Sequence, residues 1–260
     1  MYRKIVFSVF KYNLIYKIDF IGSLINSIAG LAVFWFIWNA IYASSGVTIL
    51  NGVTLTSMIT YISISFLIRT YSHSYGEHYI HDEVKHGGIA TIITKPVNYI
   101  FYNFSREIGN TLYRFVSNGV LIIIIAFLLL GIYLPQFPAE FFTSIFLGFL
   151  INFFITMLVG LWSFWAGSIW GLRFSKNVIM EITSGSVFPL FLFPDWFVKI
   201  AYFLPFQAVY NIPLSIYTGQ ILGSEIYVFL LMQVFWCFAL GFLTLIVWKF
   251  AQRRIFIQGG

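Results

Sequence analysis

Long blocks of apolar residues, separated by charged or turn-forming stretches, dominate the chain. Between Phe20 and Ile68 there is no charged residue. At 1.5 Å per helical residue this block would be about 70 Å long, roughly twice the ~30 Å hydrocarbon core of a bilayer. The block therefore has to turn, and the turn signals are Ala43-Ser44-Ser45-Gly46 and Asn51-Gly52. The pattern predicts two membrane-spanning helices joined by a short loop.

The same pattern along the whole chain predicts an all-α membrane protein with six transmembrane helices. The expected spans are Phe20–Ala43, Val53–Arg69, Phe115–Leu134, Phe141–Leu172, Asn177–Pro194 and Ile226–Trp248. The fourth span has no charged residue over its whole length and exceeds a perpendicular crossing, so we expect it to tilt or to project into the cytoplasm. We expect residues 1–260 to form a single membrane domain.

The region before the last span is irregular. The apolar segment Ile200–Leu222 is interrupted by Pro205, Pro213 and Gly219. If this segment crossed the membrane fully, the basic C-terminus would lie on the opposite side from the other basic loops. We therefore expect residues 195–225 to form a re-entrant or interfacial helix pair on the outer side. Such broken backbone is stable at membrane depth only where it is buried in protein or lines a cavity.

Basic residues lie almost entirely on one side of the predicted membrane. With these spans, Lys199 alone falls on the other side. The remaining lysines and arginines are Arg3, Lys4, Lys11, Lys17, Arg69, Lys85, Lys95, Arg106, Arg114, Arg173, Lys176, Lys249, Arg253 and Arg254. By the positive-inside rule, both termini and the loop between the second and third spans are predicted to be cytoplasmic. Residues 1–18 are expected to form an interfacial helix that contacts membrane lipids.

Composition agrees with this assignment. The chain is 60% hydrophobic and 9% charged, with a mean hydropathy of +0.87, far from the usual mix of a soluble protein. The net charge of +6 sits at span ends rather than in one patch. This distribution suits anionic lipid headgroups and argues against nucleic acid as a partner.

The sequence of the predicted cytoplasmic loop between the second and third spans, residues 70–110, indicates how this loop is folded. A compact polar helix is predicted over Glu77–His86, and Gly87-Gly88 is a good signal for its end. A short apolar stretch then closes at Lys95-Pro96, and a second amphipathic stretch, Tyr99–Glu107, leads into the third span. A short charged helix at the cytoplasmic end of two spans is suited to docking in a groove of a soluble partner.

Two motifs resemble those of ABC type-2 transporter permeases. The first is Ile80-His81-Asp82-Glu83-Val84-Lys85-His86-Gly87-Gly88-Ile89, followed by Thr94-Lys95-Pro96. The second is Leu204-Pro205-Phe206 with Pro213 and Gly219 before the last span. One departure is that Ile93 and Thr94 stand where the family usually has Leu before the Lys-Pro pair. With the interfacial helix and the six-span layout, the likeness covers nearly the whole chain.

This resemblance implies a permease subunit of an ATP-driven exporter in the plasma or inner membrane. It implies two partners, a second permease subunit, identical or homologous, and separate ABC ATPase subunits. The chain has no G-x-x-x-x-G-K-[ST] sequence, so ATP and Mg²⁺ are expected on the ATPase, with no cofactor, metal or catalytic residue here. The expected ATPase-coupling residues are Glu77, His81, Asp82, Glu83, Lys85, Gly88, Lys95 and Pro96, with Gly88 allowing the sharp exit from the helix.

Other polar residues support weaker hypotheses. All four histidines, His73, His78, His81 and His86, lie close together, but their spacing favours a solvated or partner-facing helix over a metal site. Glu181 is the only acid well inside a span, and either pairs with Arg173 or Lys176 or lines a transport path. Pro189 and Phe206 are further candidates for that path.

The spans carry no row of charges, so any pathway is apolar or aromatic. This favours a lipid-like, amphipathic, drug or peptide cargo over ions. The alternative functions are a secondary carrier and a membrane-embedded enzyme. The carrier would show paired broken spans in both halves, and the enzyme would show clustered acids and histidines near one membrane face.

Cysteine labelling tests the predicted topology. With Cys237 replaced, single cysteines at Lys85 and at Gln258 are both expected to react only from the cytoplasmic side, because of the charge distribution. Reaction from opposite sides would exclude six crossings and the re-entrant assignment of Ile200–Leu222.

Overall fold

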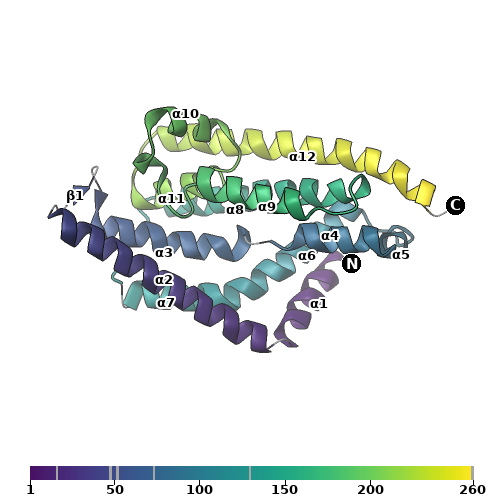
Figure 1. Ribbon diagram of the computed structural model, residues 1–260, viewed down its shortest axis with the longest axis horizontal. Coiled ribbons are helices and arrows are strands. Elements are labelled where there is room, and N and C mark those ends of the chain that lie inside the picture. The colour runs from purple at the N-terminus through teal and green to yellow at the C-terminus, as the bar shows by residue number, and fades with distance from the viewer. Residues whose placement is uncertain (16, 47–48, 51–52, 73, 129, 259–260) are drawn as a thin grey trace.

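A computed structural model describes residues 1–260 apart from 16, 47–48, 51–52, 73, 129 and 259–260. The regular elements of this described part are helices, apart from one short β-hairpin (Figure 1). The N-terminal half contains α1 (Tyr2–Ile15), α2 (Lys17–Ser45), β1 (Ile49–Leu50), β2 (Val53–Thr54), α3 (Leu55–Ser72), α4 (Gly76–Lys85), α5 (Gly88–Ile93), α6 (Tyr99–Arg114), the π-helical turn η1 (Phe115–Gly119) and α7 (Val120–Leu128). The rest contains α8 (Pro138–Leu161), η2 (Trp162–Phe164), α9 (Trp170–Thr183), η3 (Leu190–Leu192), α10 (Asp195–Phe203), α11 (Asn211–Thr218) and α12 (Glu225–Gln258).

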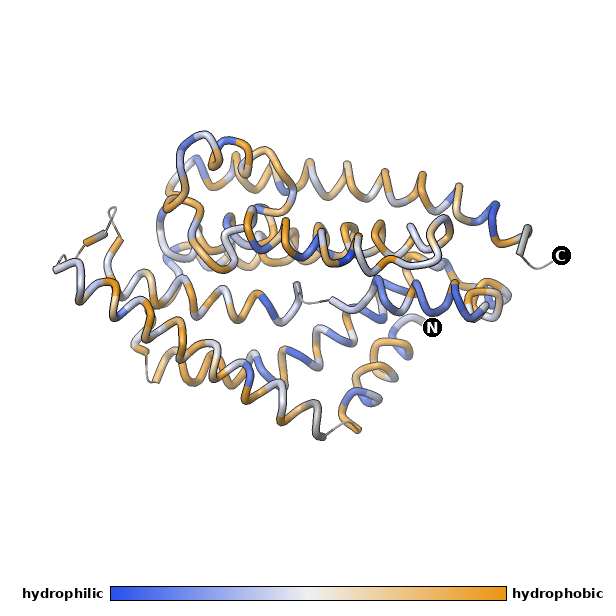
Figure 2. Tube along the Cα trace, viewed as in Figure 1, coloured by the Kyte–Doolittle hydropathy of each residue, from blue (hydrophilic) through white to orange (hydrophobic). Residues whose placement is uncertain are grey.

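The all-α prediction is confirmed. Within the described residues, four helical stretches are long and apolar enough to cross a membrane: Phe20–Ser45, Tyr99–Leu128, Pro138–Phe164 and Glu225–Ile255. Apolar residues cover most of their length, and polar residues gather around α4 and the adjoining part of α6 (Figure 2). The first and last of these stretches contain the predicted first and sixth spans. α12 continues well past Trp248, the predicted end.

The predicted second span corresponds to α3, which is long enough but not apolar enough to meet this criterion. The predicted fifth span, Asn177–Pro194, is wrong in its bounds, because α9 begins at Trp170 and ends at Thr183 and is too short to meet the criterion. α9 has 14 residues, and α3 has 18 and carries hydroxyl side chains along its length. Many of those side chains, Thr60, Ser63 and Ser65 among them, are fully enclosed by the protein. Because α3 is surrounded by other helices rather than by lipid, it does not need an apolar surface. The six-span topology therefore stays a prediction.

Two other predicted boundaries are wrong. The third span does not begin at Phe115, because α6 continues through η1 into α7, and it ends at Leu128 rather than at Leu134. The fourth span does not run from Phe141 to Leu172, since α8 ends at Leu161 and α9 begins at Trp170. The turn between them is uncharged, and absence of charge alone does not distinguish an apolar turn from a helix.

The predicted irregular segment contains two short helices, α10 and α11, which lie at the opposite end of the molecule from α4 and α5 (Figure 1). Side chains from α3 donate hydrogen bonds to backbone carbonyls of this segment and of the turn that follows α9. Tyr61 donates to Gly185 O at 2.7 Å, Ser65 to Ser186 O at 2.6 Å, and Tyr71 to Val209 O at 2.9 Å. From α12, Gln233 Nε2 donates to Ala208 O at 2.7 Å. These bonds satisfy broken backbone that has no water partner inside the protein.

The main hydrophobic core joins α3, α8, α11 and α12. Its fully buried members include Ile68, Ile151, Leu214 and Ile226. A second cluster lies at the other end, where α4, α5, α6, α8 and α12 meet, and it includes Ile80, Leu161 and Trp248. The two clusters fix both ends of α8 and thereby the distance between the α10–α11 segment and α4.

The bond between Tyr61 and Gly185 makes a stability prediction. Tyr61→Phe leaves the Gly185 carbonyl without its donor, and we expect it to lower the free energy of unfolding by about 1–3 kcal/mol. Tyr227→Phe, at a tyrosine that is 59% exposed, is the matched control and should change it by less than about 0.5 kcal/mol. Denaturant titration of the purified protein in detergent measures both, and equal effects would contradict the role assigned to Tyr61.

Candidate functional site

The predicted coupling helix is α4, and it packs closely against the Leu161 end of α8. Two glycines allow the approach. A Cβ on Gly160 would lie 2.7 Å from Ile80 Cδ1, and a Cβ on Gly76 would lie 2.9 Å from Thr156 Cγ2. Ile80 is 1% exposed. α4 is therefore fastened to a long apolar helix rather than suspended in a loop.

The predicted end of this helix at the glycine pair is confirmed. α4 ends at Lys85, and Gly87 adopts φ 72°, which a residue with a side chain rarely takes. Gly88 opens α5 instead of making the turn. The buried Ile89 and Ile92 hold α5 on the second hydrophobic cluster. The chain thus reverses direction at Gly87 and stays packed.

One ion pair holds the C-terminal half of α4 to α6. Arg106 Nη2 lies 2.5 Å from Glu83 Oε1, and Tyr99 Oη donates to Glu83 Oε2 at 2.7 Å. The Arg106 guanidinium also lies 5.0 Å from the ring centre of Tyr79 and 4.9 Å from that of Tyr102. Both charged side chains are largely enclosed, so Glu83 binds within the chain.

A second ion pair holds the start of α4 to α9. Lys176 Nζ lies 2.9 Å from Glu77 Oε1, and the two side chains are only 6% and 2% exposed. The pair joins residues 99 positions apart in the sequence. A buried pair of this kind is costly to break, because the partner left behind keeps an uncompensated charge. The pair therefore fixes the start of α4 to α9.

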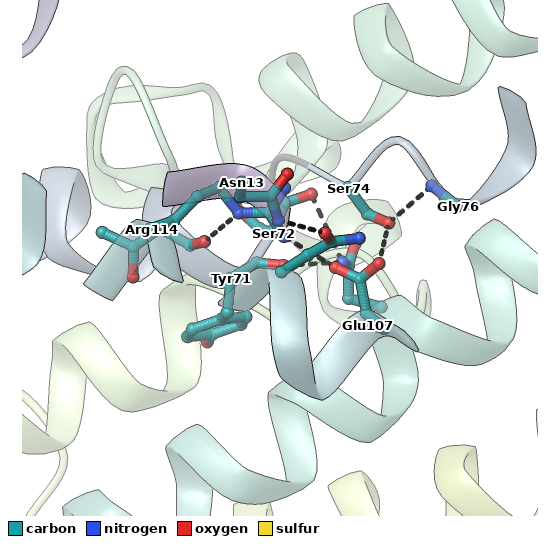
Figure 3. Close-up of polar contacts among 10 residues, drawn as sticks. Asn13, Tyr71, Ser72, Ser74, Gly76, Glu107 and Arg114 are labelled. Atoms are coloured by element: carbon teal, nitrogen blue, oxygen red, sulfur yellow. Dashed lines mark hydrogen bonds and ion pairs between the residues drawn. The ribbon is translucent and has the colours of Figure 1, made fainter. Parts of the chain in front are cut away.

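A third ion pair lies where α3 ends and α6 passes (Figure 3). Arg114 Nη2 is 2.7 Å from Glu107 Oε1, and Arg114 Nε donates to Thr70 O at 2.8 Å. Ser74 Oγ donates to Glu107 Oε2 at 2.8 Å and accepts the N–H of Gly76 at 3.0 Å. The connection from α3 into α4 is thus held by a continuous polar network.

The structure separates the predicted coupling residues into two sets. Glu77 and Glu83 are engaged inside the chain, and His81 is half-buried with Nδ1 3.1 Å from Ser163 Oγ. Burial, followed by the charge of Lys85, lowers the pKa of His81. The exposed members are Lys85, Lys95 and Pro96, with Asp82 and Gly88 half-exposed. We call residues 85–96 the tip, and its exposed surface also carries Ile93.

His78 and His81 lie on α4 and His86 belongs to the tip, whereas the path candidates lie elsewhere. His73 falls outside the described residues, and no group of three possible metal ligands occurs in the described part of the chain. Glu181 lines a cavity of about 120 Å³ with Arg69 and Arg173, while Lys176 binds Glu77 instead.

Pro189 lies between α9 and η3, and Phe206 lies in the irregular segment between α10 and α11. Pro189 is buried before η3, and Phe206 packs on the main core. The structure therefore brings neither of them to the cavity that Glu181 lines.

Sequence reasoning missed a larger cavity of about 900 Å³ between α2, α3 and the α6–η1 helix. The signal was present in the first apolar block. Gly22, Ser23, Asn26, Ser27 and Gly30 recur at helical spacing and form one polar and small face of α2. We call this cavity the groove.

Taken together, the long apolar helices and the tightly anchored tip define a multi-pass helical membrane protein. The sequence profile described as ABC-2 family transporter protein matches residues 28–259, most of the chain. The chain therefore belongs to the ABC-2 family of transporters, as the motifs indicated. No curated protein matches it.

The engaged state of Glu83 makes a prediction that distinguishes it from its neighbour. Glu83→Gln leaves Arg106 enclosed without its carboxylate, and we expect it to lower the free energy of unfolding by about 2 kcal/mol. Asp82→Asn is the matched control, because the Asp82 side chain is 46% exposed and its one ion pair within the described residues is with His78, at 3.4 Å. It should change stability by less than about 0.5 kcal/mol. Thermal unfolding in detergent measures the difference, and equal stabilities would refute the anchoring role.

Proposed function

We propose that this chain is the permease subunit of an ATP-driven ABC exporter. In this assignment it forms the translocation path together with a second permease subunit, identical or homologous, and is driven by separate ATPase subunits that bind ATP and Mg²⁺. Membership of the ABC-2 transporter family supports the class. The cargo class that best suits apolar and aromatic spans is a lipid-like or amphipathic molecule.

The observation that carries the proposal is the contrast between the tip and its base. Residues 85–96 expose Lys85, Ile93, Lys95 and Pro96, while the base of α4 is held by the ion pairs of Glu77 and Glu83. The exposed tip can dock on a partner, and the base of α4 is fixed to α6 and α9. A movement of the partner is therefore transmitted into the membrane helices. In this proposal the docking contacts are made by the tip and Asp82, and the buried carboxylates carry the motion onward to α6 and α9.

The arrangement of the ends supports a common cytoplasmic side. α1 and the end of α12 lie at the same end of the molecule as α4 and α5 (Figure 1). The prediction of six crossings, cytoplasmic termini and an outer re-entrant pair α10–α11 agrees with this placement and with the charge distribution.

The exposure of α2 supports pairing with a second subunit. Only 6% of the most apolar stretch of α2 is buried inside the chain. The exposed surface of this helix carries large apolar side chains such as Ile25, Val33 and Phe36. In the proposed dimer, α2 and α9 supply the seam, because α3 is enclosed within its own chain, and lipid covers what remains. Purification with the cognate ATPase is expected to yield two membrane subunits for every two ATPases.

Ile93→Asp tests the docking role of the tip. Burying an isoleucine at an interface is worth about 1.5–3 kcal/mol, so we expect binding of the cognate ATPase to weaken by about 10- to 100-fold. Ile93 is 39% exposed, and the variant should therefore insert and fold normally. Leu222→Asp, at a leucine that is 49% exposed near the opposite end, is the matched control and should bind like wild type. Normal ATPase binding and stimulation by Ile93→Asp would remove the tip from the proposed mechanism.

A further inference from the structure

The groove is polar at one end and apolar at the other. Towards the α4 end it is lined by Arg69, Tyr75 and Tyr79, and towards the other by Phe34 and Ile122. From Gly22 to Phe34 it follows α2 for about 18 Å at 1.5 Å per residue. This length and the volume of about 900 Å³ fit a headgroup with the first part of its acyl chains.

Arg69 gives the groove a positive charge. Among the described residues that line it, the charged ones are Arg69 and Arg114, and no carboxylate is present. Arg114 is occupied by Glu107. Arg69 also lines the smaller cavity with Glu77 and Glu181. It forms no ion pair within the described part of the chain, and its guanidinium lies 5.2 Å from the ring centre of Phe66. An arginine without a carboxylate partner in a polar recess is suited to an anionic ligand.

The π-helical turn η1 supplies the opposite wall. Its wider winding interrupts the α6–α7 helix where Ser117 and Asn118 line the groove. Ser23 Oγ from α2 donates to Asn118 Oδ1 at 3.2 Å. Three helices thus present hydrogen-bonding groups to the same space at the depth of an apolar helix. Polar groups at that depth are costly unless a ligand or protein satisfies them.

We propose that the groove binds an amphiphile with an anionic headgroup from the inner leaflet, and that this amphiphile is the cargo. Arg69 binds the headgroup, the polar faces of α2 and η1 contact its glycerol-like or sugar-like part, and the acyl chains extend past Phe34 and Ile122. The inference rests on the proposed exporter function and names the chemical class of its cargo.

Photolabelling in nanodiscs tests this inference. The protein is reconstituted in phosphatidylcholine with a probe lipid that carries a diazirine near the start of its acyl chain. The probe has either a phosphatidylglycerol or a phosphatidylcholine headgroup. We expect the anionic probe to label peptides of α2 and η1 in preference to the zwitterionic one. Arg69→Gln should reduce this preference by about tenfold, because it removes a charge-assisted contact. Arg69→Lys should keep most of it.

Matched variants separate the groove from general charge effects. Arg173→Gln removes the same charge from the neighbouring cavity that Glu181 lines, outside the groove, and should label like wild type. Ser27→Trp fills the groove without changing its charge and should abolish labelling by both probes. Unfolding temperatures confirm that each variant is folded. Equal labelling by the two probes in wild type, or an unchanged preference in Arg69→Gln, overturns the proposal.

Two further arms identify the ligand's source and role. Excess inorganic phosphate carries the charge without acyl chains and should not displace the probe, whereas displacement would show a site for a free anion and overturn the proposal. With the ATPase bound, ATP turnover should reduce labelling. Labelling that ignores ATP would show a resident lipid and overturn the cargo assignment. ATPase binding is measured in the same preparation, so a failed headgroup preference with normal ATPase binding refutes this inference alone.

Discussion

Every backbone N–H and C=O at membrane depth needs a partner inside the protein, and this constraint organises the structure. The chain leaves regular helix repeatedly between α8 and α12, so its carbonyls there need donors from elsewhere. The donors are side chains of α3 and α12, among them Tyr61, Ser65 and Gln233. These two helices consequently keep polar groups that lipid-facing helices would not tolerate. Their positions are set by hydrogen bonds as well as by packing.

α3 binds the irregular backbone along most of its length, from Tyr61 to Tyr71. Its last turn also meets the polar network beside α4. There Ser72 hydrogen-bonds Tyr210, and Arg114 binds the Thr70 carbonyl. A change in the position of α4 therefore reaches the outer turns through one short, enclosed helix. Hydropathy alone does not identify α3 as a membrane span, because many of its side chains are polar. Those polar side chains are needed for its connecting role.

The sequence predicted the parts of the fold that local pattern determines. Uninterrupted apolar blocks located the long helices, proline and glycine located the irregular segment, and the glycine pair located the end of α4 within one residue. The break after Leu161 was missed because Gly167 and Ser168 interrupt the helix without any charge. The partners of Glu77 and Glu83 were also missed, since Lys176 and Arg106 are remote in sequence and only the tertiary fold brings them together. The polar face of α2 could be recognised in the sequence. That it lines a groove could not be predicted, because the groove depends on which helices pack opposite this face.

α12 is a continuous helix of about 50 Å, longer than a perpendicular membrane crossing requires. Near its end, the ring of Trp248 stacks on Tyr99 at a centroid distance of 4.5 Å, beside the buried face of α5. Its start adjoins the outer turn at Gly223, about 35 Å away. Over that length a tilt of roughly 5° about Trp248 displaces the start of α12 by about 3 Å. A small rotation of α12 about Trp248 is therefore enough to open or close a gap between side chains at its Glu225 end.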